Sequence, residues 1–185
     1  MGDEVKETPI ASSFSLTDIN KWVLSQTDEE YVSHDWENLK EIIESNDLSI
    51  LKRKPSDLRR YIKWSTETKA QYGTAPSDYK ILLNDWPYGL APGITHIVVW
   101  SRTLIPTESV VGDLTPESRV LIEDFVKKHF VDTLGPNGKD QVLWFKNWVS
   151  LQSVRALEHF HVLVRDVDDD TLERWTGERP QRGAQ

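Results

Sequence analysis

The most informative part of the chain is a pair of segments, Leu151-Gln152-Ser153-Val154 and, after three further residues, Glu158-His159-Phe160-His161-Val162-Leu163-Val164. Residues two apart on a strand point to the same side, so His159 and His161 are expected to present two imidazoles together. Histidine suits nucleophilic, acid–base and metal chemistry near neutral pH. The first segment adds amide and hydroxyl groups of the kind that bind phosphate or carboxylate oxygens. This part of the chain therefore predicts a site rather than a piece of core.

Composition limits what such a site can serve. The 185 residues suffice for one domain with a substantial core. The formal charge of −8 argues against a broad surface for nucleic acid polymers or anionic membranes. The absence of cysteine excludes disulfides, thiolate zinc sites and cysteine nucleophiles. We find no apolar run of membrane-spanning length and no targeting-type start, so we expect a cytoplasmic protein that also enters the nucleus by diffusion.

Apolar spacing predicts a helical N-terminal third that follows a flexible arm over residues 1–16. The predicted helices are a short one around Ile19–Val23, one from Trp36 to Ile43, and one from Pro55 to Tyr72. The basic residues between and within the last two helices are interpreted as a solvated helix face rather than the alternative, a phosphate clamp: Lys52-Arg53-Lys54 and Arg59-Arg60.

The second half of the chain changes to β-type patterns. Strands are predicted at Tyr79–Leu83, Thr95–Trp100, Val142–Phe145 and His159–Val164. A loop over 103–113 leads to a long helix that starts at Thr115-Pro116-Glu117. Its expected apolar side comprises Val120, Leu121, Phe125, Val126 and Phe130.

Two shorter features complete the pattern. Asn137-Gly138 predicts a tight turn between the long helix and the next strand. The acidic run Asp166–Asp170 predicts an exposed C-terminal helix or tail.

This order of elements resembles the histidine-triad (HIT-like) superfamily. The residues that resemble family motifs are Asn84, Pro87, Pro92-Gly93, His96-Ile97-Val98-Val99, Leu114-Thr115-Pro116-Glu117, Asn147, Gln152-Ser153-Val154, His159, His161 and Arg165. They span about residues 79–165.

A second resemblance covers the full length and points to a fungal family of unknown function named for induction by N-acetylglucosamine. Its motifs are Asn84-Asp85-Trp86-Pro87-Tyr88-Gly89, Ile97-Val98-Val99-Trp100, Trp144-Phe145-Lys146-Asn147, Leu151-Gln152-Ser153-Val154 and Glu158-His159-Phe160-His161-Val162. This resemblance names an inducing sugar rather than a reaction.

The HIT-like resemblance implies an enzyme that acts on a phosphorylated or nucleotide-like small molecule through a strand histidine, by hydrolysis or transfer, with no cofactor. It implies that His159 and His161 are catalytic. The implied substrate-binding residues are Asn84, Trp86, Asn147, Gln152, Ser153 and Arg165. Family members also pair into homodimers.

The histidine triad is incomplete in this chain. In the family, three alternating histidines follow almost directly after the Gln-Ser-Val segment, whereas here four residues separate that segment from the first of only two histidines. If Arg165 matches the family arginine, Leu157 replaces the first histidine and His159 is the middle one. If the first pair is matched instead, His161 is the nucleophile and Leu163 replaces the third histidine. Sequence alone leaves both alignments open.

Two other functions fit the same residues. His96, His159 and His161 could together ligate Zn, Fe or Cu in a metal-dependent enzyme of small-molecule or specialised metabolism. Alternatively, the pocket binds a sugar or nucleotide without catalysis. The candidate residues for stacking on a sugar are Trp86, Trp100, Trp144 and Trp148.

The sequence as a whole predicts an α+β fold, with a HIT-like antiparallel sheet, one long connecting helix and an added N-terminal helical layer. The expected divisions are a flexible arm (1–16), the helical layer (17–75), the HIT-like core (76–166) and an acidic C-terminal helix or tail (167–185), all within a single globular domain.

Overall fold

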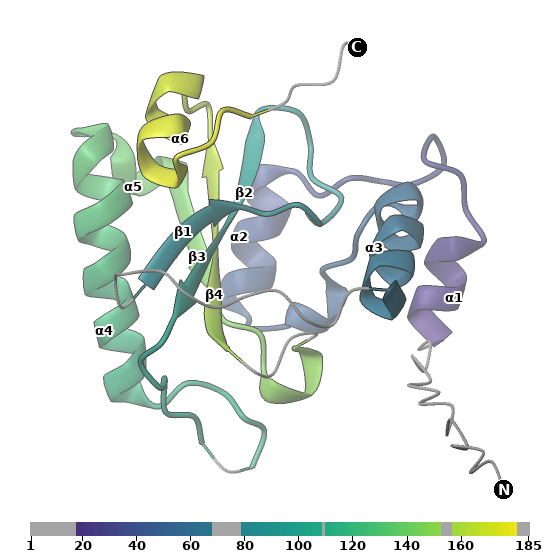
Figure 1. The fold of residues 1–185 in the computed structure, drawn as a ribbon, viewed down its shortest axis with the longest axis horizontal. Helices are drawn as coiled ribbons and strands as arrows, with labels where there is room; N and C mark the ends of the chain where they lie inside the picture. The colour runs from purple at the N-terminus through teal and green to yellow at the C-terminus, as the bar shows by residue number, and fades with distance from the viewer. Residues whose placement is uncertain (1–17, 68–78, 109, 153–156, 181–185) are drawn as a thin grey trace, which may run out of the picture.

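The computed structural model describes residues 18–67, 79–108, 110–152 and 157–180, within which it holds six α-helices and one four-stranded sheet (Figure 1). The strands are β1 (Tyr79–Leu83), β2 (Ile94–Ser101), β3 (Val142–Phe145) and β4 (Glu158–Arg165), in the spatial order β1-β2-β4-β3. Every neighbouring pair is antiparallel. The expected α+β class with an antiparallel sheet is confirmed.

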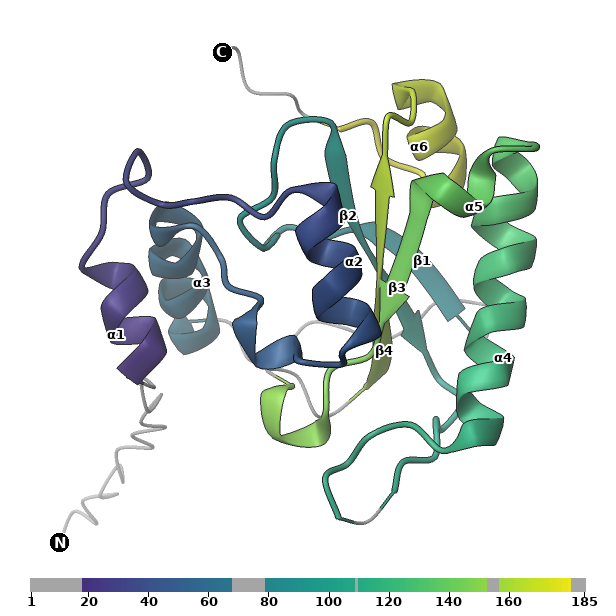
Figure 2. The same ribbon diagram turned by 180° about the vertical axis from the view of Figure 1, so that it is seen from behind.

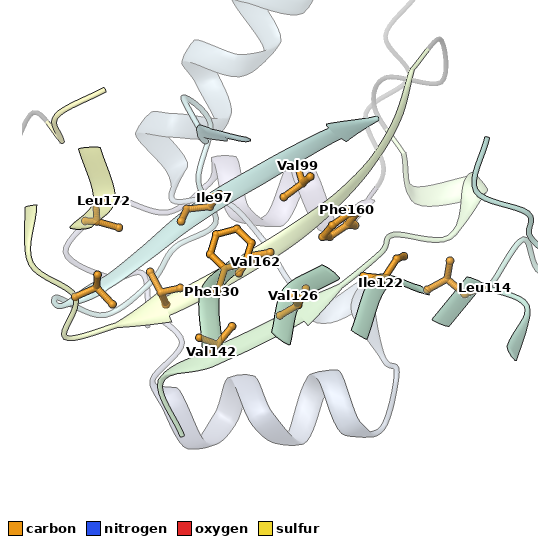
Figure 3. Close-up of a cluster of buried hydrophobic side chains, with 12 residues drawn as sticks. Ile97, Val99, Leu114, Ile122, Val126, Phe130, Val142, Phe160, Val162 and Leu172 are labelled. Atoms are coloured by element: carbon orange, nitrogen blue, oxygen red, sulfur yellow. The ribbon is translucent and has the colours of Figure 1, made fainter. Parts of the chain in front are cut away.

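The central strand β4 is covered on both faces, since only its two end residues are not fully buried. Phe160, Val162 and Val164 alternate along it and pack on one face against Ile97 and Val99 of β2 (Figure 3). The side chains between them, which include both histidines, therefore point to the opposite face.

Helix α4 (Pro116–Val126) connects β2 to β3 and covers the apolar face shown in Figure 3. Thr115 caps it as the sequence predicted, because its side-chain oxygen accepts a hydrogen bond of 3.2 Å from the backbone N–H of Ser118. The chain continues helically through a π-helical turn (Lys127–Val131) and a 3₁₀ turn (Asp132–Leu134).

The buried side of this helix differs from the predicted one. Ile122, Val126 and Phe130 enter the core, whereas Val120 and Leu121 are 55% and 68% exposed, so their expected burial was wrong. Three consecutive apolar residues at 120–122 point to three sides of a helix. Only Ile122 is four residues from Val126, and that spacing places it on the face that meets the sheet.

Two predictions near β3 and β4 also need correction. Gly138 does not form a simple tight turn but begins the short helix α5 (Gly138–Gln141). The acidic C-terminal segment forms α6 (Asp169–Thr176), capped by Asp168, and it is not merely exposed because Leu172 is fully buried against the sheet. The acidic residues dominate the sequence pattern of this helix, so its buried residues, which are Thr171, Leu172 and Thr176, are not evident from the sequence.

The opposite face of the sheet is covered by α2 (Trp36–Glu44) and the 3₁₀ turn that follows it (Leu48–Ile50) (Figure 2). Leu39 of α2 is fully buried and belongs to the same cluster as Phe145 and Leu163 of the sheet. The N-terminal helices thus form a layer on the face that carries the histidines.

Helices α1 (Asp18–Leu24) and α3 (Pro55–Glu67) contact each other at the end of the molecule away from α4 (Figures 1 and 2). Val23, Leu58 and Tyr61 form a small buried cluster there. The predicted arm over residues 1–16 and the predicted end of the third helix at Tyr72 lie outside the described residues. The expected domain boundaries remain predictions.

No helix in the described part of the chain is both long enough and apolar enough to span a membrane.

Candidate active site

Strand alternation and register bring the histidines to one face of the sheet. In the β2–β4 pair His161 lies opposite Val98, and His159 lies opposite Trp100. His96 is two residues before Val98 on β2, so it belongs to the same face. Strand β4 thus presents two imidazoles on one face, as the sequence predicted, and β2 adds a third imidazole to that face.

His96 and His161 touch directly. Nε2 of His96 and Nδ1 of His161 are 2.9 Å apart, although the residues are 65 positions apart in the chain. Asn147, just after β3, places its Nδ2 3.3 Å from Nε2 of His161 and donates a 3.0 Å hydrogen bond to the hydroxyl of Tyr88. The Asn84 amide is 3.1 Å from Nε2 of His96. These polar groups form one connected buried network.

His159 has a different partner. Its Nδ1 is 3.1 Å from the backbone carbonyl oxygen of Leu157. The ring lies against Trp100, at 4.7 Å between centroids, and meets the His161 ring edge-on at 5.5 Å.

The three rings are held in their neutral form. Burial, and secondarily the positive charge of Arg53, lowers the pKa of His96 to about 3. Burial also lowers the pKa of His161 well below its ordinary value. Burial lowers the pKa of His159 too, partly offset by the hydrogen bond to the Leu157 carbonyl. All three are therefore uncharged at neutral pH.

A small pocket of about 70 Å³, partly open to solvent, lies between the sheet and the N-terminal layer. Its described lining residues are Arg53, Tyr61, Leu82, Leu83, Asn84, Asp85, Trp86, Tyr88, Val98, Trp100, Asn147, His159 and His161. The pocket thus gathers both histidines of β4 with three of the expected substrate-binding residues.

The other expected site residues lie elsewhere. Gln152 does not line the pocket, but its side chain donates a 2.9 Å hydrogen bond to the backbone oxygen of Asn147, which does. The guanidinium of Arg165 lies 4.8 Å from the centre of the Trp36 ring, beside α2. His96 lines a neighbouring groove instead. Ser153 falls outside the described residues.

Arg53 is a pocket residue that the preferred sequence interpretation placed on a solvated surface. The basic cluster was interpreted as a solvated helix face, and for Arg53 this was wrong, because it lies before α3 and lines the pocket. Its Nε donates a 3.0 Å hydrogen bond to the carbonyl of Trp86. Its guanidinium is 4.1 Å from the centre of the Tyr61 ring and 5.5 Å from that of Tyr88. No periodic pattern marks such a loop residue.

The described residues contain no group of three or more His, Cys, Asp or Glu side chains placed to hold a metal ion. His96 and His161 are bonded to each other, which occupies one nitrogen of each ring. The three-histidine metal site stays a prediction.

The chain is similar to a protein family and to two fungal proteins. A family model described as "Protein of unknown function (DUF3605)" matches residues 35–77 and 74–165. Over 96 residues the chain is 46% identical to the N-acetylglucosamine-induced protein 1 of Candida albicans, which covers 51% of this chain. The match spans only 37% of that protein. Over 168 residues the chain is 29% identical to the uncharacterized protein YPL067C of Saccharomyces cerevisiae, covering 77% of this chain and 84% of that protein.

A similar solved structure is the crystal structure of HTC1, with a TM-score of 0.61 and 26% sequence identity. The similarity covers 76% of this chain and 91% of that chain. The expected relation to the fungal N-acetylglucosamine-induced proteins is confirmed at family level. Since the family model matches both the helical layer and the sheet, over more than half of the chain, this protein belongs to the DUF3605 family.

Proposed function

We propose that this protein is a divergent HIT-like enzyme that hydrolyses or transfers a phosphoryl or nucleotidyl group of a small molecule, with His159 as the nucleophile. The observation that carries the proposal is the 3.1 Å contact between Nδ1 of His159 and the carbonyl oxygen of Leu157. A carbonyl can only accept, so Nδ1 carries the proton and Nε2 keeps its lone pair. A neutral imidazole fixed in this tautomer is ready to act as a nucleophile.

The same contact favours one of the two alignments left open by the sequence. In that alignment His159 is the middle histidine, Leu157 stands in place of the first, and Arg165 matches the family arginine. The bond to Leu157 uses only its backbone, so a leucine side chain at this position leaves the interaction intact.

The proposed reaction has two steps. Nε2 of His159 attacks phosphorus, an N–P bond forms, and the P–O bond to the leaving group breaks, with the leaving oxygen taking a proton from water. A second water then attacks phosphorus and breaks the N–P bond, and the proton that it loses goes to the hydroxide left by the first step, which returns the neutral imidazole. Asn84, Trp86 and Asn147 line the pocket where they can contact the rest of the substrate, and His161 lies against the nucleophile.

The test uses two chromogenic esters, 4-nitrophenyl phosphate and thymidine 5′-(4-nitrophenyl phosphate), which represent phosphoryl and nucleotidyl transfer. We expect His159→Asn to reduce nitrophenol release by roughly 100-fold or more. His34→Asn, which removes a histidine outside the pocket, is the matched control. Intact mass spectrometry at alkaline pH should detect a phosphorus adduct on the wild type and none on His159→Asn.

Equal turnover by wild type and His159→Asn would overturn the proposal. Ligand-dependent thermal stabilisation with no turnover and no adduct would instead favour a non-catalytic binding protein.

A further inference from the structure

Arg53 is held in the pocket by a hydrogen bond and an aromatic ring, and among the described residues it forms no ion pair. Its Nε is bonded to the Trp86 carbonyl, and the guanidinium lies over the Tyr61 ring. These contacts hold the side chain in place without a negative partner, because a carbonyl and an aromatic face supply only partial charges.

The nearby carboxylates do not pair with it. Among the described residues, no carboxylate oxygen lies within 4.0 Å of an Arg53 side-chain nitrogen. Asp57 pairs with Arg60 at 3.5 Å, and burial raises the pKa of its carboxyl although the charges of Arg60 and Arg53 act to lower it. Asp85 is exposed and lines the same pocket. The half-buried guanidinium of Arg53 therefore keeps N–H donors that no carboxylate of the described residues uses. The planar arrangement of these donors matches the oxygens of a phosphate or carboxylate group.

Arg53 and His159 both line the pocket, Arg53 from the segment before α3 and His159 from strand β4. The Tyr88 ring stands beside the guanidinium at 5.5 Å and beside the His96 ring at 5.1 Å. The charge of Arg53 lowers the pKa of His96 and of His161, whereas the side-chain charges that act on His159 are Lys146 and Glu158. His159 lies two residues from His161 on β4, and residues two apart on a strand are separated by about 7 Å.

We propose that Arg53 binds a second anionic group of the substrate, so that the preferred substrates are small phosphate esters that also carry another phosphate or a carboxylate. This inference rests on the proposed function, because the phosphate at His159 defines the other end of the ligand. The recognition element comes from the N-terminal helical layer, while the reacting group comes from the sheet.

The experiment compares three probes built on one sugar skeleton: glucose 6-phosphate, glucose 1,6-bisphosphate and 6-phosphogluconate. Binding to the full chain is measured by calorimetric titration for the wild type, Arg53→Gln, Arg53→Lys and His159→Asn. Arg102→Gln removes the same charge from an exposed position outside the pocket and is the matched control.

We expect the wild type to bind at least one of the two-anion probes about tenfold or more tightly than glucose 6-phosphate, since a hydrogen bond to a charged group contributes at this scale. Arg53→Gln should abolish this preference, and Arg102→Gln and His159→Asn should keep it. Arg53→Lys should retain part of it, because the charge remains without the planar fork. The preferred probe tells whether the second anion is a phosphate or a carboxylate.

Equal affinity of the wild type for all three probes, or a preference that survives in Arg53→Gln, would overturn the inference, as would no binding of any probe. A folded Arg53→Lys protein supplies the comparison if Arg53→Gln fails to fold. A preference that depends on Arg53 but occurs without turnover would leave the anion subsite standing and remove the catalytic proposal. Turnover that depends on His159 without any preference would do the reverse.

Discussion

At the scale of single residues, the site is governed by burial of uncharged imidazoles. His96 and His161 are both at least 94% buried and are hydrogen-bonded to each other. Protonation of either ring is therefore unfavourable, because the resulting positive charge would lack hydration by water. His159 differs because a backbone carbonyl fixes its tautomer. The hydrogen bonds around the three rings therefore differ, and the proposed nucleophilic role of His159 rests on this difference.

This burial predicts a pH dependence of stability. The folded-state pKa values of His96, His159 and His161 are lowered, whereas in the unfolded chain each is near 6.5. As the pH falls towards and below about 6.5, the unfolded state therefore binds more protons than the folded state. The free energy of unfolding should consequently fall as the pH drops from about 7.5 to about 5. The slope approaches about 1.4 kcal/mol per pH unit for each histidine that stays neutral when folded.

Urea unfolding at several pH values in this window measures the slope. His161→Asn should reduce it, and His34→Gln should not, because His34 lies outside the buried network. A wild-type free energy that stays constant between pH 7.5 and pH 5 would contradict the prediction.

At the scale of elements, the strands were easier to predict than the faces of the helices. A strand has only two faces, so an alternating run such as β4 fixes which side chains share one. A helix presents a continuous surface, and the apolar run at 120–122 is compatible with more than one buried side. The choice of Ile122 over Leu121 came from contact with the sheet.

Core truncation on α4 and its extension tests this assignment. Phe130→Ala should lower the free energy of unfolding by about 3–5 kcal/mol, because Phe130 is fully buried within the cluster of Figure 3. Leu121→Ala, at an exposed position nine residues earlier on α4, should change it by less than about 0.5 kcal/mol. Comparable losses in chemical denaturation would show that the buried side is assigned wrongly.

The short helix α5 offers a second element-scale prediction. A methyl group at Gly138 would overlap the carbonyl oxygen of Val131, which belongs to backbone and cannot move aside easily. Gly138→Ala should therefore destabilise the protein by about 1–3 kcal/mol or more. Lys139→Ala, at an exposed position in the same helix, should be near neutral in the same thermal or urea unfolding assay. A stable Gly138→Ala protein would argue against this close approach.

At the scale of the whole molecule, the helical layer and the sheet share a core. Trp36 and Leu39 of α2 pack in one cluster with Phe145 and Leu163 of the sheet. The pocket has the same mixed origin, since Arg53 and Tyr61 come from the layer and the histidines from β4. A site built between two layers exists only when both are folded together.

This shared core predicts a single cooperative transition. Far-UV circular dichroism and tryptophan fluorescence should give the same urea midpoint, because burial of Leu39 and Leu163 depends on both layers at once. Leu39→Ala should shift both curves together, by about 2–5 kcal/mol. Two separate transitions, with the helical signal lost first, would show that the layer folds independently.

Short-range patterns in the sequence determined the four strands, the capped start of α4 and the placement of His159 and His161 on one face of β4. These features depend on backbone geometry over a few residues, which local side chains set directly. Only the tertiary structure decided that His96 meets His161, that Arg53 enters the pocket and that Arg165 lies beside Trp36. Such contacts join distant segments, and they form because the helical layer and the sheet must bury their apolar faces against each other.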